Sequence, residues 1–295
     1  MQSPRRFSPT MGLAVSFVLV MAILSSGVEI SSASAQVAIG AIGSKGASAS
    51  AVAQRVAPPP SPTSTTPVTP VPKTPPSTSA HFGTLPVGAA LPSDATCAAA
   101  VRPTAEIRPD NVQANHTVGI GSTTENPRVT GNFTGTTDEI IQWASCKWGI
   151  DEDVVRAQIA KESAWHQNAK GDLNNDQSTC YPALRTASGP CPESIGLGQV
   201  RFLYSGAAFS NGNAVNSSAY NLDFTYSQWR ACFDGQKTWV NTVERGAQYA
   251  AGDMWGCVGL WFAGRWYTDP AKTYIAAVQS YLNQRVWETA NFSNW

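Results

Sequence analysis

The sequence predicts a mainly α-helical domain behind a signal peptide and a disordered stalk rich in proline, serine and threonine. Three observations lead to this prediction. A short apolar run lies near the N-terminus, all ten tryptophans lie at or after Trp143, and helix caps with helical periodicity begin only at Thr136. We therefore expect the folded domain to occupy residues 97–295, with an irregular N-terminal extension to about residue 135.

Residues 1–35 have the order of a secretory signal peptide. Arg5 and Arg6 precede an apolar run over residues 11–24, and small residues follow up to Ala35, before Gln36. A helix needs about 20 apolar residues to span a bilayer, so the run is short for an anchor, and no later stretch serves better. We expect cleavage after Ala35, with no stable membrane insertion afterwards; an uncleaved anchor is the alternative.

Residues 36–96 are predicted to be a disordered linker. Alanine, proline, serine and threonine dominate them, and these residues bury too little apolar surface to offset the entropy of ordering. Proline is concentrated between residues 57 and 80, which favours an extended, semi-rigid spacer.

Charge and cysteine content exclude several classes of function. The 20 basic residues balance the 20 acidic ones, so we expect no electrostatic binding of nucleic acid or of an anionic membrane. Six cysteines in an exported chain predict disulfides, and no Cys-x-x-Cys spacing indicates zinc, so we expect neither a metal nor a cofactor. Cys180 and Cys191 are near enough to close one loop. Three pairings stay open for the other four, Cys97, Cys146, Cys232 and Cys257.

Two helices are predicted in the first part of the domain. Thr136-x-x-Glu139 has the form of a capping box, and the helix that it opens should end at Gly149. Asp151 is the expected N-cap of a second helix that continues to about Trp165. Residues 168–192 are rich in glycine, asparagine and proline, and are expected to form a long irregular segment.

Three later helices are predicted, over residues 237–251, over residues 254–267 and from Pro270 onward. Asp269 is the expected cap of the last helix, with Pro270 at its first position. Its apolar face is predicted to carry Ile275, Val278, Leu282 and Val286.

Glu162 is the candidate catalytic residue. Val155, Ile159 and Glu162 occupy positions i, i+4 and i+7 of the predicted helix, so the carboxyl should lie on the same inward face as the two apolar side chains. Burial disfavours the charged form of a carboxyl and raises its pKa. A carboxyl that stays protonated near neutral pH can donate a proton to a leaving oxygen, which suits glycosidic cleavage.

Two motifs, one that contains Glu162 and one later in the chain, resemble those of the soluble lytic transglycosylase family, which belongs to the lysozyme-like superfamily. They are Glu162-Ser163-x-Trp165 and the run from Ser194 to Gln199, Ser-Ile-Gly-Leu-Gly-Gln. The resemblance covers roughly residues 138–287 and implies a lysozyme-like fold.

The resemblance also implies roles for single residues. Glu162 would be the acid and base, and Ser163, Ser194 and Gln199 would bind the substrate. The family's third motif, Ala-Tyr-Asn-Ala-Gly, is nearest to the run from Leu260 to Gly264, in which Trp261 replaces the tyrosine. Trp261 can stack on a sugar but offers only an indole N–H, so the role of the tyrosine is altered or moved to Tyr267.

By this resemblance the substrate would be peptidoglycan glycan strands, cut by a monomeric bacterial enzyme outside the cytoplasmic membrane. Glu162 would protonate the oxygen between N-acetylmuramic acid and N-acetylglucosamine, and then deprotonate the muramyl 6-hydroxyl to give a 1,6-anhydro sugar. One alternative is a muramidase that activates water with a second carboxylate, from Asp172, Asp176 or Glu193. The other is a wall-binding protein that kept the fold and lost turnover, because the third motif is altered.

Overall fold

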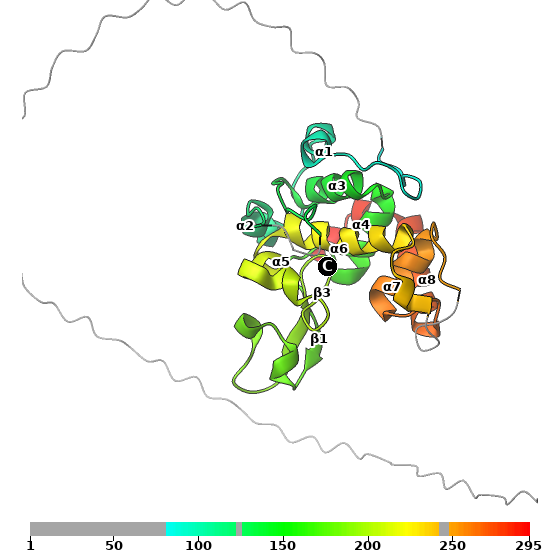
Figure 1. Cartoon of the computed structure of the whole chain (residues 1–295). Helices are drawn as coiled ribbons and strands as arrows, with labels where there is room; N and C mark the ends of the chain where they lie inside the picture. The colour runs from blue at the N-terminus through cyan, green and yellow to red at the C-terminus, as the bar shows by residue number, and fades with distance from the viewer. Residues whose placement is uncertain (1–80, 122–125, 242–247) are drawn as a thin grey trace, which may run out of the picture. The chain divides into compact units, whose positions relative to one another are not determined.

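The computed structural model describes residues 81–121, 126–241 and 248–295 (Figure 1). The predicted signal peptide and residues 36–80 of the predicted linker lie outside these ranges. The described part is mainly α-helical, as predicted, with one small sheet. Its helices are α1 (Asp94–Ala100), α2 (Val112–Asn115), α3 (Thr137–Trp148), α4 (Glu152–Ser163), α5 (Asn213–Asn216), α6 (Ser218–Phe233), α7 (Met254–Ala263) and α8 (Asp269–Gln284), and its strands are β1 (Lys170–Asn174), β2 (Cys191–Ile195) and β3 (Val200–Arg201).

Helices α3 and α4 form as the local sequence predicts. Thr136 and Glu139 make both hydrogen bonds of the capping box, and Gly149 ends α3 in the left-handed conformation. The Asp151 side chain accepts hydrogen bonds from the backbone N–H groups of residues 153 and 154, and so caps α4.

The later helices differ from the prediction. Helix α6 was not predicted, and almost every residue in it is buried. The helix predicted over residues 237–251 is wrong in its described part: only a 3-10 turn forms at Thr238–Asn241, residues 248–251 are not helical, and residues 242–247 lie outside the described ranges. Helix α7 ends at Ala263 rather than at residue 267, because Gly264 adopts the left-handed conformation. Thr268, rather than Asp269, is the N-cap of α8.

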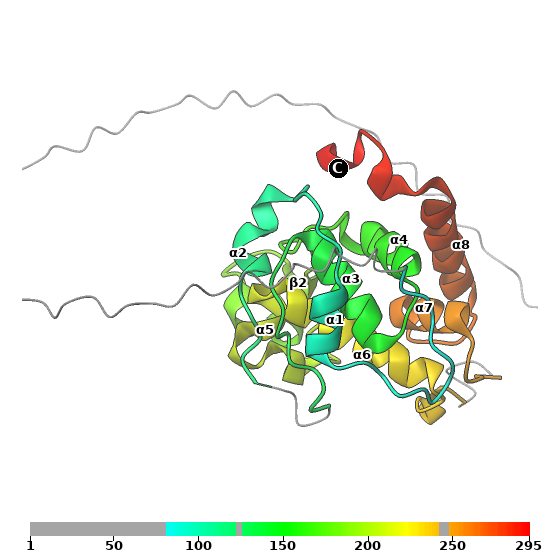
Figure 2. The same cartoon turned by 90° about the horizontal axis from the view of Figure 1, so that it is seen from above.

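The segment expected to be irregular, residues 168–192, contains strand β1 and the start of β2. Together with β3, which follows it, they form an antiparallel sheet in the order β1-β2-β3. In β1 and β2, Lys170 pairs with Ile195 and Gly171 with Ser194. The Cys180–Cys191 disulfide closes the loop before β2, as the sequence suggested. Figures 1 and 2 show this sheet on one side of α4 and α6, and the α7–α8 pair on the other.

The other disulfides settle the pairings that the sequence left open. Cys97 of α1 is bonded to Cys146 of α3, and Cys232 of α6 is bonded to Cys257 of α7. All six cysteines are therefore paired. The first bond ties the N-terminal extension to the helical core, and the second joins two helices that flank the candidate site.

The ordered N-terminal extension is longer than predicted, because it begins at His81 rather than at Cys97. Leu85 donates a backbone hydrogen bond to Gly149, and the His81 ring contacts Asp151. The extension is also fixed by Lys147, whose ammonium is fully buried and pairs with Asp94 and Asp223 at 2.7 Å each. Among the described helices, none has the length and apolar character to cross a bilayer.

Candidate active site

Glu162 lies in the last turn of α4, where the helix meets α8. Val155 and Ile159 are fully buried, as their spacing predicted, whereas the Glu162 side chain is only partly buried. The hydroxyl of Tyr274 in α8 donates a short hydrogen bond to Oε1 of Glu162. Phe262 of α7 stacks on the Tyr274 ring, with centroids 4.5 Å apart and an interplanar angle of 2°. Three helices therefore meet at this carboxyl.

Burial raises the pKa of Glu162 from its ordinary 4.5 to about 7. The hydrogen bond from Tyr274 and the charge of Lys161 oppose the shift, because both favour the ionised carboxylate. The charge of Asp172 adds to it. With a pKa near 7, both forms of the carboxyl are populated at neutral pH. One group can then donate a proton and later accept one.

The Gly196–Gln199 loop is bonded to the end of α4 and to α7. The Ser163 hydroxyl donates to the Leu197 carbonyl at 2.9 Å and to the Ile159 carbonyl at 3.2 Å. The Trp261 indole N–H donates to the Gly198 carbonyl at 3.0 Å. Ser163 and Trp261 were both predicted to contact the sugar. In this structure their polar hydrogens bond carbonyls of the loop and of α4, and their contacts with a sugar stay a prediction.

The two glycines of this loop are explained by the close approach of α6. A Cβ on Gly196 would lie 2.1 Å from the Asn221 amide nitrogen, and one on Gly198 would lie 2.1 Å from the Thr225 hydroxyl. Asn221 is fully buried, accepts a hydrogen bond from the Gly198 N–H and donates one to the Ile195 carbonyl. The loop therefore packs against helix α6, which was not predicted, and is hydrogen-bonded to it.

Gln199 is held between the loop and strand β1. Its backbone is left-handed, with φ of 51°, and its amide donates to the carbonyls of Ala169 and Gly196. Its Oε1 lies against Gly171, where an added Cβ would come within 2.3 Å. The two predicted motifs therefore meet through the Ser163 contact with Leu197, and Gln199 lies at the border of the sheet.

Of the three candidate second carboxylates, only Asp172 acts on Glu162. It is half exposed, lies on β1, and accepts a hydrogen bond from the Ser194 hydroxyl. Asp176 bonds Ser178 in a turn, which lowers its pKa. Glu193 is buried and pairs with Arg201 and Asn174, whose hydrogen bonds outweigh burial and lower its pKa. These two carboxylates therefore have structural partners.

Tyr274 is the site residue that the sequence reasoning missed. Burial raises its pKa well above 10, so it remains a hydrogen-bond donor to Glu162. Tyr267, the predicted substitute for the family tyrosine, instead donates to Asp253 at 3.0 Å and braces the start of α7. The available signal was the spacing of Ala271, Tyr274 and Val278, which places the tyrosine on the buried face of α8.

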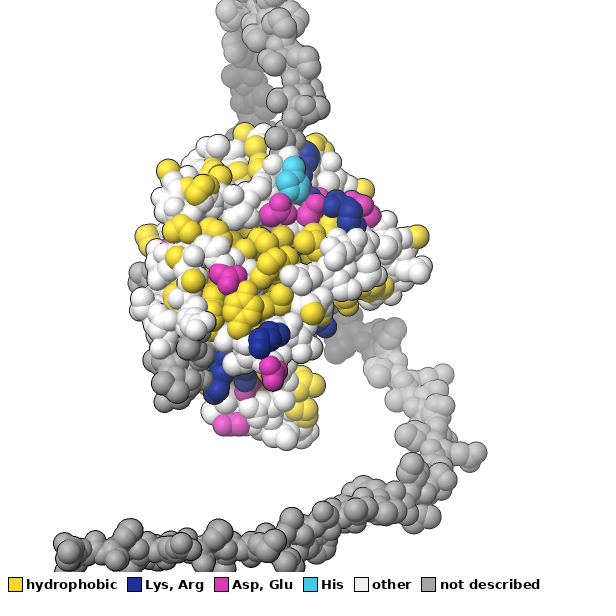
Figure 3. Space-filling view, turned by 90° about the vertical axis from the view of Figure 1, so that its right-hand side faces the viewer, with side chains coloured by type: hydrophobic (Ala, Val, Ile, Leu, Met, Phe, Trp, Pro, Cys, Tyr) yellow, Lys and Arg dark blue, Asp and Glu magenta, His cyan; other side chains and the backbone are white. Residues whose placement is uncertain are grey.

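The surface on the α7–α8 side carries exposed apolar side chains. Figure 3 shows them as a continuous band across this face, between a group of charged residues with one histidine and a second charged group. Helix α7 contributes Phe262, which is 55% exposed, and the partly buried Met254, Trp255 and Trp261. Aromatic faces of this kind can stack on sugar rings.

One group of potential metal ligands occurs among the described residues: His81, Glu152 and Asp153, whose ligand atoms lie within 4.8 Å of one another. Arginines already neutralise both carboxylates. Glu152 pairs with Arg102 and Arg156, and Asp153 pairs with Arg156. We therefore assign no metal to this group.

No family model, curated protein or solved structure matches the chain. Membership of the lytic transglycosylase family thus stays a prediction from the two motifs.

Proposed function

We propose that this chain is a secreted bacterial enzyme that cleaves peptidoglycan glycan strands as a lytic transglycosylase, with Glu162 as its single acid and base. The observation that carries the proposal is the Glu162 carboxyl itself, whose pKa of about 7 and bond to Tyr274 suit proton transfer at neutral pH. Its position beside the Gly196–Gln199 loop agrees with the roles that the two motifs imply.

In the proposed reaction, protonated Glu162 donates its proton to the oxygen between N-acetylmuramic acid and N-acetylglucosamine. The resulting carboxylate then takes the proton of the muramyl 6-hydroxyl as that oxygen attacks the anomeric carbon. The products are a 1,6-anhydro-muramyl end and a free N-acetylglucosamine 4-hydroxyl, and no water is consumed. Tyr274 stabilises the carboxylate formed between the two steps, because its hydroxyl donates to that oxygen.

Hydrolysis is a second candidate because Asp172 is close enough to influence the ionisation of Glu162. A half-exposed carboxylate on the neighbouring strand could act as a base toward water on the other face of the sugar. In that case replacing Asp172 by Asn would abolish turnover, whereas the transglycosylase mechanism needs no second carboxylate. Asp176→Asn, in the same segment of residues 168–192, is the matched control.

The deciding experiment is mass spectrometry of purified peptidoglycan after digestion by the full chain. Anhydro-muramyl ends are expected, and Glu162→Gln should abolish their release while leaving wall association intact. Reducing muramyl ends that disappear in Asp172→Asn would instead establish the muramidase. If the wild-type protein binds the wall and releases no fragments, the protein is a non-catalytic wall-binding protein, and the proposal is wrong.

A further inference from the structure

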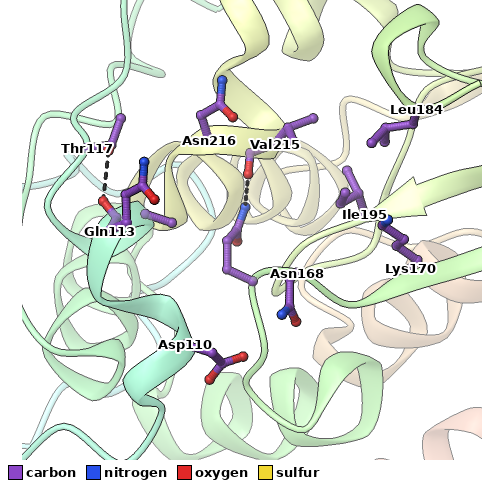
Figure 4. A pocket seen from close by; sticks show the side chains of 11 residues that line it. Asp110, Gln113, Thr117, Asn168, Lys170, Leu184, Ile195, Val215 and Asn216 are labelled. Atoms are coloured by element: carbon purple, nitrogen blue, oxygen red, sulfur yellow. Dashed lines mark hydrogen bonds between the residues drawn. The ribbon is translucent and has the colours of Figure 1, made fainter. Parts of the chain in front are cut away.

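A cavity of about 580 Å³ lies next to the candidate active site and is not lined by Glu162. One wall comes from the N-terminal extension and the opposite wall from the sheet and the disulfide loop. Figure 4 shows Asp110, Gln113 and Thr117 on one side, and Lys170, Ile195 and Leu184 on the other. Its volume lies within the range of pockets that bind small ligands.

Four of the polar side chains around this cavity are exposed, those of Gln113, Asn168, Lys170 and Asn216. In the part of the chain that the structure describes, no hydrogen bond or ion pair engages the side chains of Gln113, Asn168 or Lys170. Primary amides both donate and accept hydrogen bonds, so they pair well with the amide groups of a peptide. Leu184, Ile195 and Val215 supply apolar surface beside them.

Opposite charges face each other across the cavity. Lys170 offers an ammonium on the sheet side, and Asp110 offers a carboxylate, bonded to His166 at 2.6 Å, on the other side. This arrangement suits a ligand that carries both a free carboxylate and a free amine. The stem peptide of peptidoglycan carries both, because it contains a D-glutamyl carboxylate and a diamino acid.

The cavity is contiguous with the residues around Glu162. Lys170 and Ile195 are direct partners across β1 and β2, and the next pair, Gly171 and Ser194, touches Gln199 and Asp172. Two residues along a strand span about 7 Å, so the Lys170 backbone lies that far from Asp172. The stem peptide is attached to the muramyl sugar whose glycosidic bond is cleaved, so it begins close to the catalytic carboxyl.

We propose that this cavity binds the stem peptide of the muramyl residue whose glycosidic bond is cut, with Lys170 pairing with a peptide carboxylate. The proposal rests on the function proposed above. It also gives the N-terminal extension a role, because Asp110, Gln113 and Thr117 form one wall of the binding site. The enzyme would then prefer glycan strands that still carry their peptides.

The test compares two substrates that differ only in the peptide: intact peptidoglycan strands, and the same strands after an amidase has removed the stems. Lys170→Ala removes the ammonium, and Gln113→Trp fills the cavity from an exposed position. Lys272→Ala, on α8 with a 60% exposed side chain, is the matched charge control. We expect both variants to lower kcat/KM about tenfold or more on intact strands. Lys170→Ala loses a hydrogen bond between charged groups, and Gln113→Trp blocks the space that the peptide would occupy. On stripped strands both variants should match the wild type.

Equal loss on both substrates, or no loss on either, would overturn the cavity proposal and leave the proposed function in place. If the wild type cleaves neither substrate, the proposed function fails, and the cavity is judged by calorimetric titration of the full chain with a synthetic stem tetrapeptide. Saturable binding that Lys170→Ala weakens about tenfold, and Lys272→Ala does not, would support the cavity site. Absence of binding would reject it.

Discussion

Replacing Glu162 by Gln should stabilise the protein at alkaline pH and not at acid pH. The pKa of Glu162 is about 7 in the folded protein and 4.5 in its ordinary state, because burial disfavours the charged carboxylate. Between pH 4.5 and about 7, the Glu162 carboxyl is therefore ionised in the unfolded chain and still protonated in the folded protein. The free energy of unfolding therefore falls as the pH rises from 4.5 to 7. Each pH unit is worth about 1.4 kcal/mol, so the interval from 4.5 to about 7 gives a loss of at most about 3.5 kcal/mol.

Glutamine has no charge to bury and can still accept the hydrogen bond of Tyr274. At pH 8 we expect Glu162→Gln to exceed the wild type in free energy of unfolding by up to about 3.5 kcal/mol, less the reduction that solvent screening causes at this partly exposed side chain. At pH 4 the two proteins should be nearly equal.

Urea denaturation followed by tryptophan fluorescence at pH 4, 6 and 8 measures this difference. Asp176→Asn is a control of opposite sign, because its turn hydrogen bonds with Ser178 lower its pKa. The charge of Asp176 stabilises the folded protein at every pH above its ordinary pKa of 3.8, so Asp176→Asn should be less stable than the wild type by a nearly constant amount at pH 4, 6 and 8. That contribution is lost only below pH 3.8, as the pH falls through the folded pKa. A stability difference between Glu162→Gln and the wild type that does not change with pH would refute the reasoning.

Three further predictions concern the surroundings of Glu162 and the core. Tyr274→Phe removes the hydrogen bond that favours the Glu162 carboxylate, so the alkaline limb of the kcat/KM profile should move up by about one pH unit. A fall in rate without a shift of that limb would show that Tyr274 acts only through packing. Asn221→Ala leaves the Gly198 N–H and the Ile195 carbonyl unpaired, which should cost about 1–3 kcal/mol for each group in urea denaturation and lower activity on peptidoglycan. Lys147→Met leaves Asp223 buried without its cation, so thermal and urea unfolding should show a loss of about 3–5 kcal/mol; an unchanged stability would mean that the pair contributes nothing.

Local chemistry made the first two helices predictable. Thr136 and Asp151 cap their helices through side chains that lie within three residues of the groups they bind, so the signal is complete in the sequence. Helix α6 was not predicted because it is buried on all sides. Its polar and apolar residues alike face other elements, so it lacks the amphipathic contrast by which a surface helix is recognised.

The helix predicted over residues 237–251 is wrong in its described part because tertiary contacts override the local pattern there. The Tyr249 hydroxyl donates to the Cys232 carbonyl, and the Gly252 N–H donates to the Phe233 carbonyl. The Cys232–Cys257 disulfide fixes both ends of the same stretch. These contacts hold residues 249–252 against the end of α6, where a continuous helix would carry them away. These contacts are with α6 and α7, so the pattern of residues within the segment does not predict them.

The run from Leu260 to Gly264 has Trp261 where the motif of the resembled family has a tyrosine, and from the sequence this difference favoured a protein without turnover. Tyr274 approaches from α8, a helix further along the chain, and places a hydroxyl on the Glu162 carboxyl. Trp261 stays on α7 and holds the Gly198 carbonyl, a task that its single N–H can perform. Because the hydroxyl and the loop contact come from different helices, the presence of tryptophan at position 261 removes neither. Trp261 is therefore no longer a reason to expect a wall-binding protein without turnover. Tyr274→Phe tests whether the Tyr274 hydroxyl contributes to the reaction.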